Sequence, residues 1–202
     1  MFRFAAIVLI CLGGMAAADT PVKRLFDQET RALNQMSQAR LASYMERPEA
    51  ELRYSRDWLA GQSLKQGGAQ WRCLAEALYF EARGESVKGQ FAVAEVIMNR
   101  VDSAEFPDSV CGVVKQGTGR KYACQFTYTC DGHPEVISEP RAFEQVGKVA
   151  KLMVDGAPRH LTAGATHYHT RAVNPRWARK FPRTASIGVH YFYRMPTRLS
   201  SN

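Results

Sequence analysis

The stretch CLAEALYFEARGESVKGQFAVAEVIMNRV, residues 73–101, decides the fold class of the chain. Apolar residues recur at helical spacing on both sides of Gly84, so each half has one apolar stripe. The first stripe consists of Leu74, Ala77, Leu78 and, at its end, Glu81; the second consists of Phe91, Ala94, Ile97, Met98 and Val101. Ser86 suits the start of the second half as a cap. The pattern therefore predicts two helices separated by a stop at Gly84.

The flanking sequence adds a third helix and a small β element. SEPRAFEQVGKVAKLMVDGAP, residues 138–158, has an apolar stripe, a possible cap at Ser138 and a proline in its first turn. Two short β-like runs follow at residues 165–170 and 188–194, whereas residues 102–137 are rich in Gly, Pro, Asp and Cys and predict a long irregular region. The sequence therefore predicts an α+β domain that is mainly α, with a small β-hairpin.

The N-terminal third differs from the rest of the chain. Residues 1–18 place Arg3 before a short apolar run and small residues, which is the layout of a secretory signal peptide. Residues 19–70 are polar and helix-favouring and end in AGQSLKQGG, so we expect a helical arm and a linker there. We expect the main domain to occupy residues 71–196, and no stable membrane insertion once the signal is removed.

Composition and charge narrow the function classes. The 202 residues are 46% hydrophobic and 23% charged, which excludes wholesale disorder. The net charge of +8 favours a polyanionic partner, such as nucleic acid, an anionic membrane or an acidic glycan, without choosing among them. No nucleic-acid-binding motif is recognisable, so we expect no nucleic-acid partner, and we expect a monomer.

Four cysteines follow the signal segment: Cys73, Cys111, Cys124 and Cys130. An even set in an exported chain predicts disulfides, and three pairings are open. Cys124 and Cys130 are close enough in sequence to close a short loop, which would leave Cys73 for Cys111. A four-cysteine zinc site is the alternative, but the spacing lacks a C-x2-C pair.

Glu81 is the candidate catalytic acid. It continues an apolar stripe in the last turn of its predicted helix, where both desolvation and the negative end of the helix dipole raise the pKa of a carboxyl group. A carboxylic acid that stays protonated near neutral pH can donate a proton to a glycosidic oxygen. The alternative is a structural glutamate paired with Arg72 or Arg83.

The other acids suggest lesser roles. Glu85 follows Gly84 near the start of the next helix, where the positive end of the dipole favours its ionised form, so we expect a supporting role. Glu76 should be solvated or salt-bridged, and Glu95 should lie on the outer face of its helix.

His167 and His169 form an H-x-H pair that, with His190, could bind a metal. No carboxylate follows at a ligand spacing, however, and we expect no metal.

Five blocks carry a family resemblance: residues 73–101, FPDSVCGVVKQ, CQFTYTCDG, ATHYHTRAVNPRWAR and IGVHYFYR. In this order they resemble the SleB-type cell-wall hydrolases, the spore-cortex-lytic and related peptidoglycan-cleaving proteins of bacteria. The resemblance covers Cys73 to Arg194 and implies a lysozyme-like fold, with no cofactor. It implies that Glu81, the first Glu of the E-A-R-G-E motif, is the catalytic acid. It also implies substrate-binding roles for Gln125, Tyr168, His169, Asn174 and Trp177.

The resemblance further implies lytic transglycosylation of peptidoglycan glycan strands with a single catalytic glutamate, which would leave 1,6-anhydromuramyl ends. The cysteine-bearing form resembles the branch found in Gram-negative bacteria, so we expect an exported, periplasmic protein. Two other functions stay open: a catalytically silent peptidoglycan-binding protein and a metal-dependent amidase.

Overall fold

The computed structural model describes residues 21–35, 52–63, 66–120 and 123–196. It divides into two units, residues 1–48 and 49–202, which are described separately. The described part of the first unit is helix α1 (Pro21–Gln35), as expected for a helical arm, and its Leu25 and Phe26 are exposed. The expected signal peptide lies outside the described residues. No described helix is both long and apolar enough to cross a membrane.

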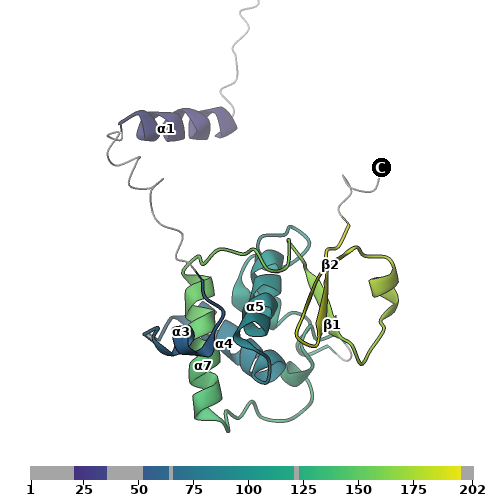
Figure 1. Cartoon of the computed structure of the whole chain (residues 1–202). Coiled ribbons are helices and arrows are strands. Elements are labelled where there is room, and N and C mark those ends of the chain that lie inside the picture. The colour runs from purple at the N-terminus through teal and green to yellow at the C-terminus, as the bar shows by residue number, and fades with distance from the viewer. Residues whose placement is uncertain (1–20, 36–51, 64–65, 121–122, 197–202) are drawn as a thin grey trace, which may run out of the picture. The chain divides into compact units, whose positions relative to one another are not determined.

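The second unit is built on three long helices. In chain order its helical elements are α3 (Arg56–Ala60), α4 (Ala69–Ala82), α5 (Val87–Val101), α6 (Val110–Val114), the 3-10 turn η1 (Thr127–Thr129), α7 (Pro140–Val154) and the 3-10 turn η2 (Arg176–Arg179). Helices α4, α5 and α7 contact one another, and a small sheet lies beside α5 (Figure 1). The core lies among these helices, with Leu74, Leu78, Phe91 and Val149 almost wholly buried.

Local signals explain several helix starts. Ser86 caps α5, because its hydroxyl accepts a hydrogen bond from the Gly89 amide at 3.2 Å. Pro140 occupies the first turn of α7 as expected. The expected Ser138 cap of α7 is wrong, because Glu139 occupies the cap position and the Ser138 hydroxyl contacts the Tyr79 hydroxyl instead. The Ser138 hydroxyl, which the local pattern assigns to the cap, thus contacts the buried Tyr79 of α4.

The β element is a three-stranded antiparallel sheet. Strands β1 (His167–Thr170) and β3 (His190–Tyr193) are the two runs predicted to pair, and their register places Tyr168 opposite Phe192. Strand β2 (Arg183–Ile187) extends the expected hairpin by pairing with the other side of β3. Its sequence, RTASI, has only Ala185 and Ile187 as alternating apolar residues, which is too short a pattern to identify a strand without the free edge of β3.

Helix α5 is buried on nearly all sides. One side packs in the main core, and the other packs with Ala92 and Val96 against Phe192 of the sheet. The expectation that Glu95 lies on an outer face is therefore wrong, because its side chain is 1% exposed. Its carboxylate accepts hydrogen bonds from the Leu161 amide and from the amide and hydroxyl of Thr162, at 2.8–3.1 Å. The buried charge is thus satisfied by the chain segment that leads into β1.

The compact domain begins earlier than the expected boundary at residue 71. The second unit starts at Glu49, and Leu59 of α3 is 1% exposed in the core shared with α4 and α7. Tyr54 packs edge-to-face on Phe91 at 5.3 Å between ring centroids. The sparse apolar residues of this stretch therefore belong to the domain, although their spacing shows no amphipathic helix.

The structure pairs Cys73 with Cys111 and Cys124 with Cys130, so the zinc alternative is wrong. The first disulfide joins α4 to α6, and the second closes the loop that carries η1. Gly117, which precedes this loop, has a positive φ of 81°, and a side chain there would overlap the Ala123 carbonyl. The irregular region is thus fixed by two covalent links and one obligatory glycine.

Replacing Glu95 by alanine should lower the free energy of unfolding by roughly 3 kcal/mol or more, because it leaves the buried amides of Leu161 and Thr162 without an acceptor. Urea denaturation followed by circular dichroism measures the change. Glu105→Ala, which removes an exposed side chain, is the control. Equal stability of the two variants would contradict this account of Glu95.

The two disulfides should contribute unequally to stability. Sequence separations of 38 and 6 residues predict losses of about 4 kcal/mol for Cys73→Ala/Cys111→Ala and about 2 kcal/mol for Cys124→Ala/Cys130→Ala, from the entropy of loop closure. Urea denaturation of both double variants under non-oxidising conditions tests the order. A larger loss for the short loop would show that loop entropy does not govern these two links.

Candidate active site

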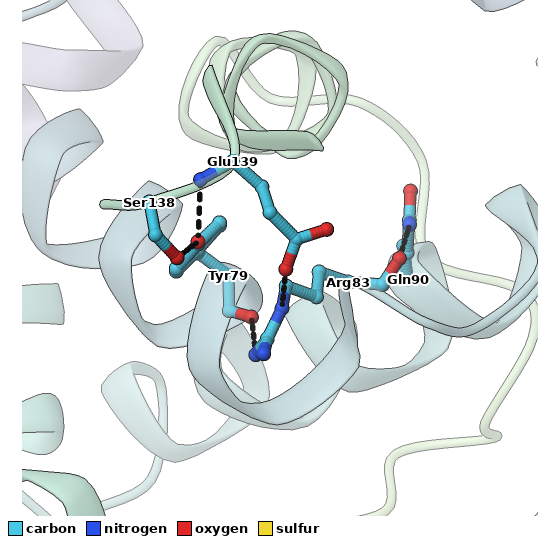
Figure 2. A network of polar contacts seen from close by, with 5 residues as sticks. All are labelled: Tyr79, Arg83, Gln90, Ser138 and Glu139. Carbon is cyan, nitrogen blue, oxygen red and sulfur yellow. Dashed lines mark hydrogen bonds and ion pairs between the residues drawn. The ribbon is translucent and has the colours of Figure 1, made fainter. Parts of the chain in front are cut away.

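The end of helix α4, where Glu81 lies, is attached to the start of α7. The Tyr79 hydroxyl accepts a hydrogen bond from the Glu139 amide at 3.0 Å and contacts the Ser138 hydroxyl at 3.2 Å. Arg83 reaches the same place, because its Nε donates to the Glu139 carboxylate at 2.8 Å and its Nη1 donates to the Tyr79 carbonyl at 3.2 Å. Figure 2 shows these contacts, which we call the α4–α7 clamp.

The turn after α4 is fixed from a second side. The Gln90 amide donates to the carbonyl oxygens of Arg83 and Glu85, each at 3.4 Å, and its oxygen accepts from Gln145 of α7 at 3.0 Å. The alternative of an ion pair between Glu81 and Arg83 is therefore wrong, because Arg83 is engaged with Glu139. Arg72 likewise pairs with Glu76, at 2.6 Å, as expected for that acid.

Glu81 faces a small polar cleft of about 140 Å³. The cleft lies between α4, α5, the loop closed by the Cys124–Cys130 disulfide, and β1. Its lining residues are Glu81, Arg100, Gln125, Phe126, Thr127 and Tyr168. Glu81 is the one carboxyl group among these described residues. The structure thus joins Gln125 and Tyr168, two of the predicted binding residues, to the predicted acid.

The environment of Glu81 favours its protonated form. Partial burial raises the pKa of its carboxyl group, and this exceeds the opposing effects of a hydrogen bond from Tyr168 and of the Arg100 charge. The Tyr168 hydroxyl donates to Glu81 Oε2 at 3.2 Å. Burial also raises the pKa of Tyr168, so this hydroxyl keeps its proton and remains a donor. The Glu81 carboxyl group is therefore oriented, and it can stay protonated at pH values above the ordinary pKa of a glutamate.

The cleft wall formed by η1 is attached to α4 by an aromatic pair. The rings of Phe80 and Tyr128 stack with centroids 4.5 Å apart, and the backbone N–H of Gln125 donates to the backbone carbonyl of Gln116 at 2.9 Å. Tyr128 and Thr129 also line a neighbouring hollow of about 450 Å³, together with Glu76 and Glu135. The wall between the two spaces therefore depends on Phe80, which directly precedes Glu81.

Glu85 does not line the cleft. Its side chain lies between Gly89 of α5 and Gly188 of the β2–β3 turn, and it is 3.8 Å from Nδ1 of the buried His190. Gly188 has a positive φ of 59°, and a side chain there would overlap the Glu85 carboxylate. The expected supporting role of Glu85 is therefore structural, because it joins the turn after α4 to the sheet.

Three other predicted binding residues lie away from the cleft. The strand register places His169 on the face of the sheet opposite Tyr168, where it stacks on Tyr193 and contacts Trp177 at 5.6 Å between centroids. Asn174 is exposed in the loop before η2. Alternate residues of a strand face opposite ways, so Tyr168 and His169 cannot both face Glu81. We therefore correct the expectation that His169, Asn174 and Trp177 line the site.

The three histidines considered as metal ligands are also divided by the sheet. His167 packs against Phe181 and Trp177 on the face of His169, whereas His190 contacts Tyr168 on the other face. Burial and the Arg100 charge lower the pKa of His167 to about 4. Within the described residues, no cluster of three His, Cys, Asp or Glu side chains is placed to bind a metal ion.

Sequence reasoning missed Arg100 as a cleft residue. Its side chain is 3% exposed, and its Nε donates to the Thr166 carbonyl at 2.7 Å. The available signal was that Arg100 directly precedes Val101 of the apolar stripe of α5. An arginine is usually expected to be solvated, so this signal is weak. Thr127 was missed for a simpler reason, since nothing in a short disulfide-closed loop indicates which side chains point inward.

The comparisons agree with this fold. A family model described as Cell Wall Hydrolase matches residues 84–193, more than half of the chain, and this segment begins three residues after Glu81. The chain is 34% identical over 121 residues to a spore cortex-lytic enzyme of Oceanobacillus iheyensis, with 59% of this chain and 39% of that protein covered. It is 58% identical over 121 residues to the spore cortex-lytic enzyme of Bacillus subtilis, covering 60% of this chain and 36% of that protein.

A solved structure resembles the folded domain. It is the catalytic domain of the germination-specific lytic transglycosylase SleB from Bacillus anthracis, with a TM-score of 0.51, 32% identity, and coverage of 66% of this chain and 98% of that one. The chain spans less than two fifths of the length of the two curated relatives named above. From these matches we conclude that the chain belongs to the SleB-type family of cell wall hydrolases.

Proposed function

We propose that this protein cleaves the glycan strand of peptidoglycan as a lytic transglycosylase, with Glu81 as its single catalytic acid and base. One observation carries the proposal: a partly buried carboxyl group with a raised pKa lies in a polar cleft, beside a tyrosine that orients it. The family membership and the lytic transglycosylase named among the solved structures support the same reaction class.

The first step is proton donation. Protonated Glu81 gives its proton to the glycosidic oxygen that leaves C1 of the muramic acid residue, and the bonding electrons go to that oxygen. Tyr168 donates to Oε2 of Glu81, which leaves Oε1 for the substrate. A carboxyl group of ordinary pKa would be ionised near neutral pH, so the desolvation that raises the pKa is what supplies the proton.

The second step uses the same side chain as a base. The Glu81 carboxylate takes the proton of the C6 hydroxyl of the same sugar while O6 bonds to C1, which closes a 1,6-anhydro ring and restores the acid. Because the nucleophile belongs to the substrate, its effective concentration is high. Two-carboxylate glycosidases instead need a second acid within about 10 Å across the bond. The absence of another carboxyl group among the described cleft residues favours the one-glutamate route.

We also propose that the protein acts outside the cytoplasm, where peptidoglycan is found. The two disulfides fit an oxidising compartment such as the periplasm. The relatives named above come from Gram-positive spore formers, so they do not support the Gram-negative, periplasmic part of our expectation.

The neighbouring hollow beside Tyr128 offers space for further sugars of the strand.

Glu81→Gln should lower the release of soluble fragments from purified peptidoglycan sacculi by about a thousandfold, in line with the loss of a positioned general acid. Mass spectrometry of the fragments identifies the reaction: anhydromuramyl ends indicate transglycosylation, reducing ends indicate hydrolysis, and freed peptides indicate an amidase.

Glu144→Gln, which changes a carboxyl group on α7 outside the cleft, is the matched control and should leave the release unchanged. Full activity of the Glu81→Gln variant would exclude Glu81 as the acid. Binding to sacculi without any cleavage by the wild-type protein would indicate the silent peptidoglycan-binding protein instead.

The raised pKa of Glu81 should also be visible in the stability of the protein. The folded state holds this proton more tightly than the unfolded state, so the wild type loses stability as the pH rises from the usual value of 4.5 through the raised pKa. Glu81→Gln removes this loss and should gain stability relative to the wild type over that range. Urea denaturation at a series of pH values measures it, with Glu105→Gln as an exposed control. A difference that does not grow with pH would contradict the raised pKa.

A further inference from the structure

The cleft contains a cation that the proposed reaction has not yet used. The Arg100 side chain is 3% exposed and is attached through Nε to the Thr166 carbonyl at 2.7 Å. Its guanidinium carbon lies 5.4 Å from the ring centroid of Phe106 and 5.8 Å from that of Phe126. The Nη1 atom is buried and has no hydrogen-bond partner. Arg100 is thus an oriented buried cation with unused donor capacity.

A buried charge needs a counter-charge, because desolvation of an isolated ion is costly. No ion pair engages Arg100 within the described part of the chain, but it lines the same cleft as Glu81. The groups that act on its charge are Tyr168 and Glu81. Burial lowers the pKa of Arg100 to about 10, so the side chain keeps its charge at neutral pH. The one acid that can balance this charge within the cleft is therefore Glu81.

We propose that Arg100 is a positioning residue that supplies the counter-charge for the carboxylate formed when Glu81 has given its proton to the leaving oxygen. The inference rests on the proposed function and adds a named partner to its two proton transfers. In the first, the proton leaves Glu81, and the new carboxylate is balanced by the guanidinium. In the second, the C6 hydroxyl proton moves to Glu81 while O6 bonds to C1, and Glu81 is neutral again.

The physical need for this partner comes from the two opposite tasks of Glu81. Burial alone favours the neutral acid and would make proton release to the glycosidic oxygen unfavourable. A fixed cation favours the carboxylate without reorganisation during the reaction. Other titratable groups at the site do not compete for this task. Tyr168 and Tyr128 have pKa values raised by burial, and His167 has a pKa lowered to about 4, so all three are neutral near pH 7.

The test compares Arg100→Met with Arg100→Lys in the full chain. Both variants lose the guanidinium contact to Thr166, but only methionine also removes the charge. Glutamate labelled with 13C at the carboxyl group reports titration by NMR, and the Glu81 signal is the one absent from a Glu81→Gln sample. Arg100→Met should raise the Glu81 pKa above that of the wild type, because the carboxylate loses its counter-charge, and Arg100→Lys should raise it less.

Activity on sacculi provides a second readout. The alkaline limb of the pH–rate profile reports loss of the protonated acid, so in Arg100→Met it should move to higher pH. Turnover at the plateau should fall by on the order of tenfold more than in Arg100→Lys, equivalent to about 1.4 kcal/mol of barrier. The apparent KM should change little, because Arg100 acts through Glu81. If Arg100→Met does not fold, Arg100→Gln serves as the neutral variant that keeps a donor.

The outcomes separate this inference from the proposed function. If Glu81 titrates at the same pH in the wild type, the neutral variant and the lysine variant, Arg100 does not act as its counter-charge. Arg100 would then serve only to anchor the Thr166 carbonyl. A titration that shifts as expected, in a wild type that releases no glycan fragments, would keep the coupling and remove the transglycosylase proposal. Shifts in both readouts support both.

Discussion

A row of polar side chains on α5 holds the chain segment that leads into the sheet, and the site depends on this row. Glu95 binds the amides of Leu161 and Thr162, Asn99 donates to the Ala165 carbonyl at 2.9 Å, and Arg100 donates to the Thr166 carbonyl. Glu95 and Asn99 are four residues apart and lie on one side of α5, and Arg100 follows Asn99 directly. They attach residues 161–166 to a rigid helix, and β1 begins directly afterwards. Tyr168 therefore reaches Glu81 from across the cleft.

The opposite wall depends on the end of α4. The α4–α7 clamp fixes the last turn of α4 through the Tyr79 hydroxyl and Arg83, while Glu85 joins the following turn to the sheet. The Glu-Ala-Arg-Gly-Glu motif at residues 81–85 thus combines one acid in the cleft with two charged residues that position it. These residues are close in sequence because Arg83 and Glu85 both fix the turn that directly follows Glu81.

Electrostatic effects in the cleft oppose one another, which suits the proposed two-step chemistry. Burial raises the pKa of Glu81, while Tyr168 and Arg100 favour the carboxylate. The net effect is a raised pKa, so Glu81 can hold the proton that it gives up in the first step. Its carboxylate can then be stabilised as the base of the second step. The disulfide-closed loop adds Gln125 and Thr127 to the same space, so a covalent link limits the movement of the wall that faces these charges.

The sequence by itself determined the helices of residues 73–101 and 140–154 and the runs that became β1 and β3, because each of these depends on local spacing. It also placed Glu81, the proposed acid, at the end of an apolar stripe. It did not identify β2, whose RTASI pattern is weak until the edge of β3 pairs with it. Nor did it show that Glu95 and Arg100 are buried, that His169 and Trp177 face away from Glu81, or that residues 52–63 belong to the domain. Those outcomes depend on the tertiary structure: α5 is covered on both sides and β1 presents alternate residues to opposite faces, and no local pattern records which neighbour covers which face.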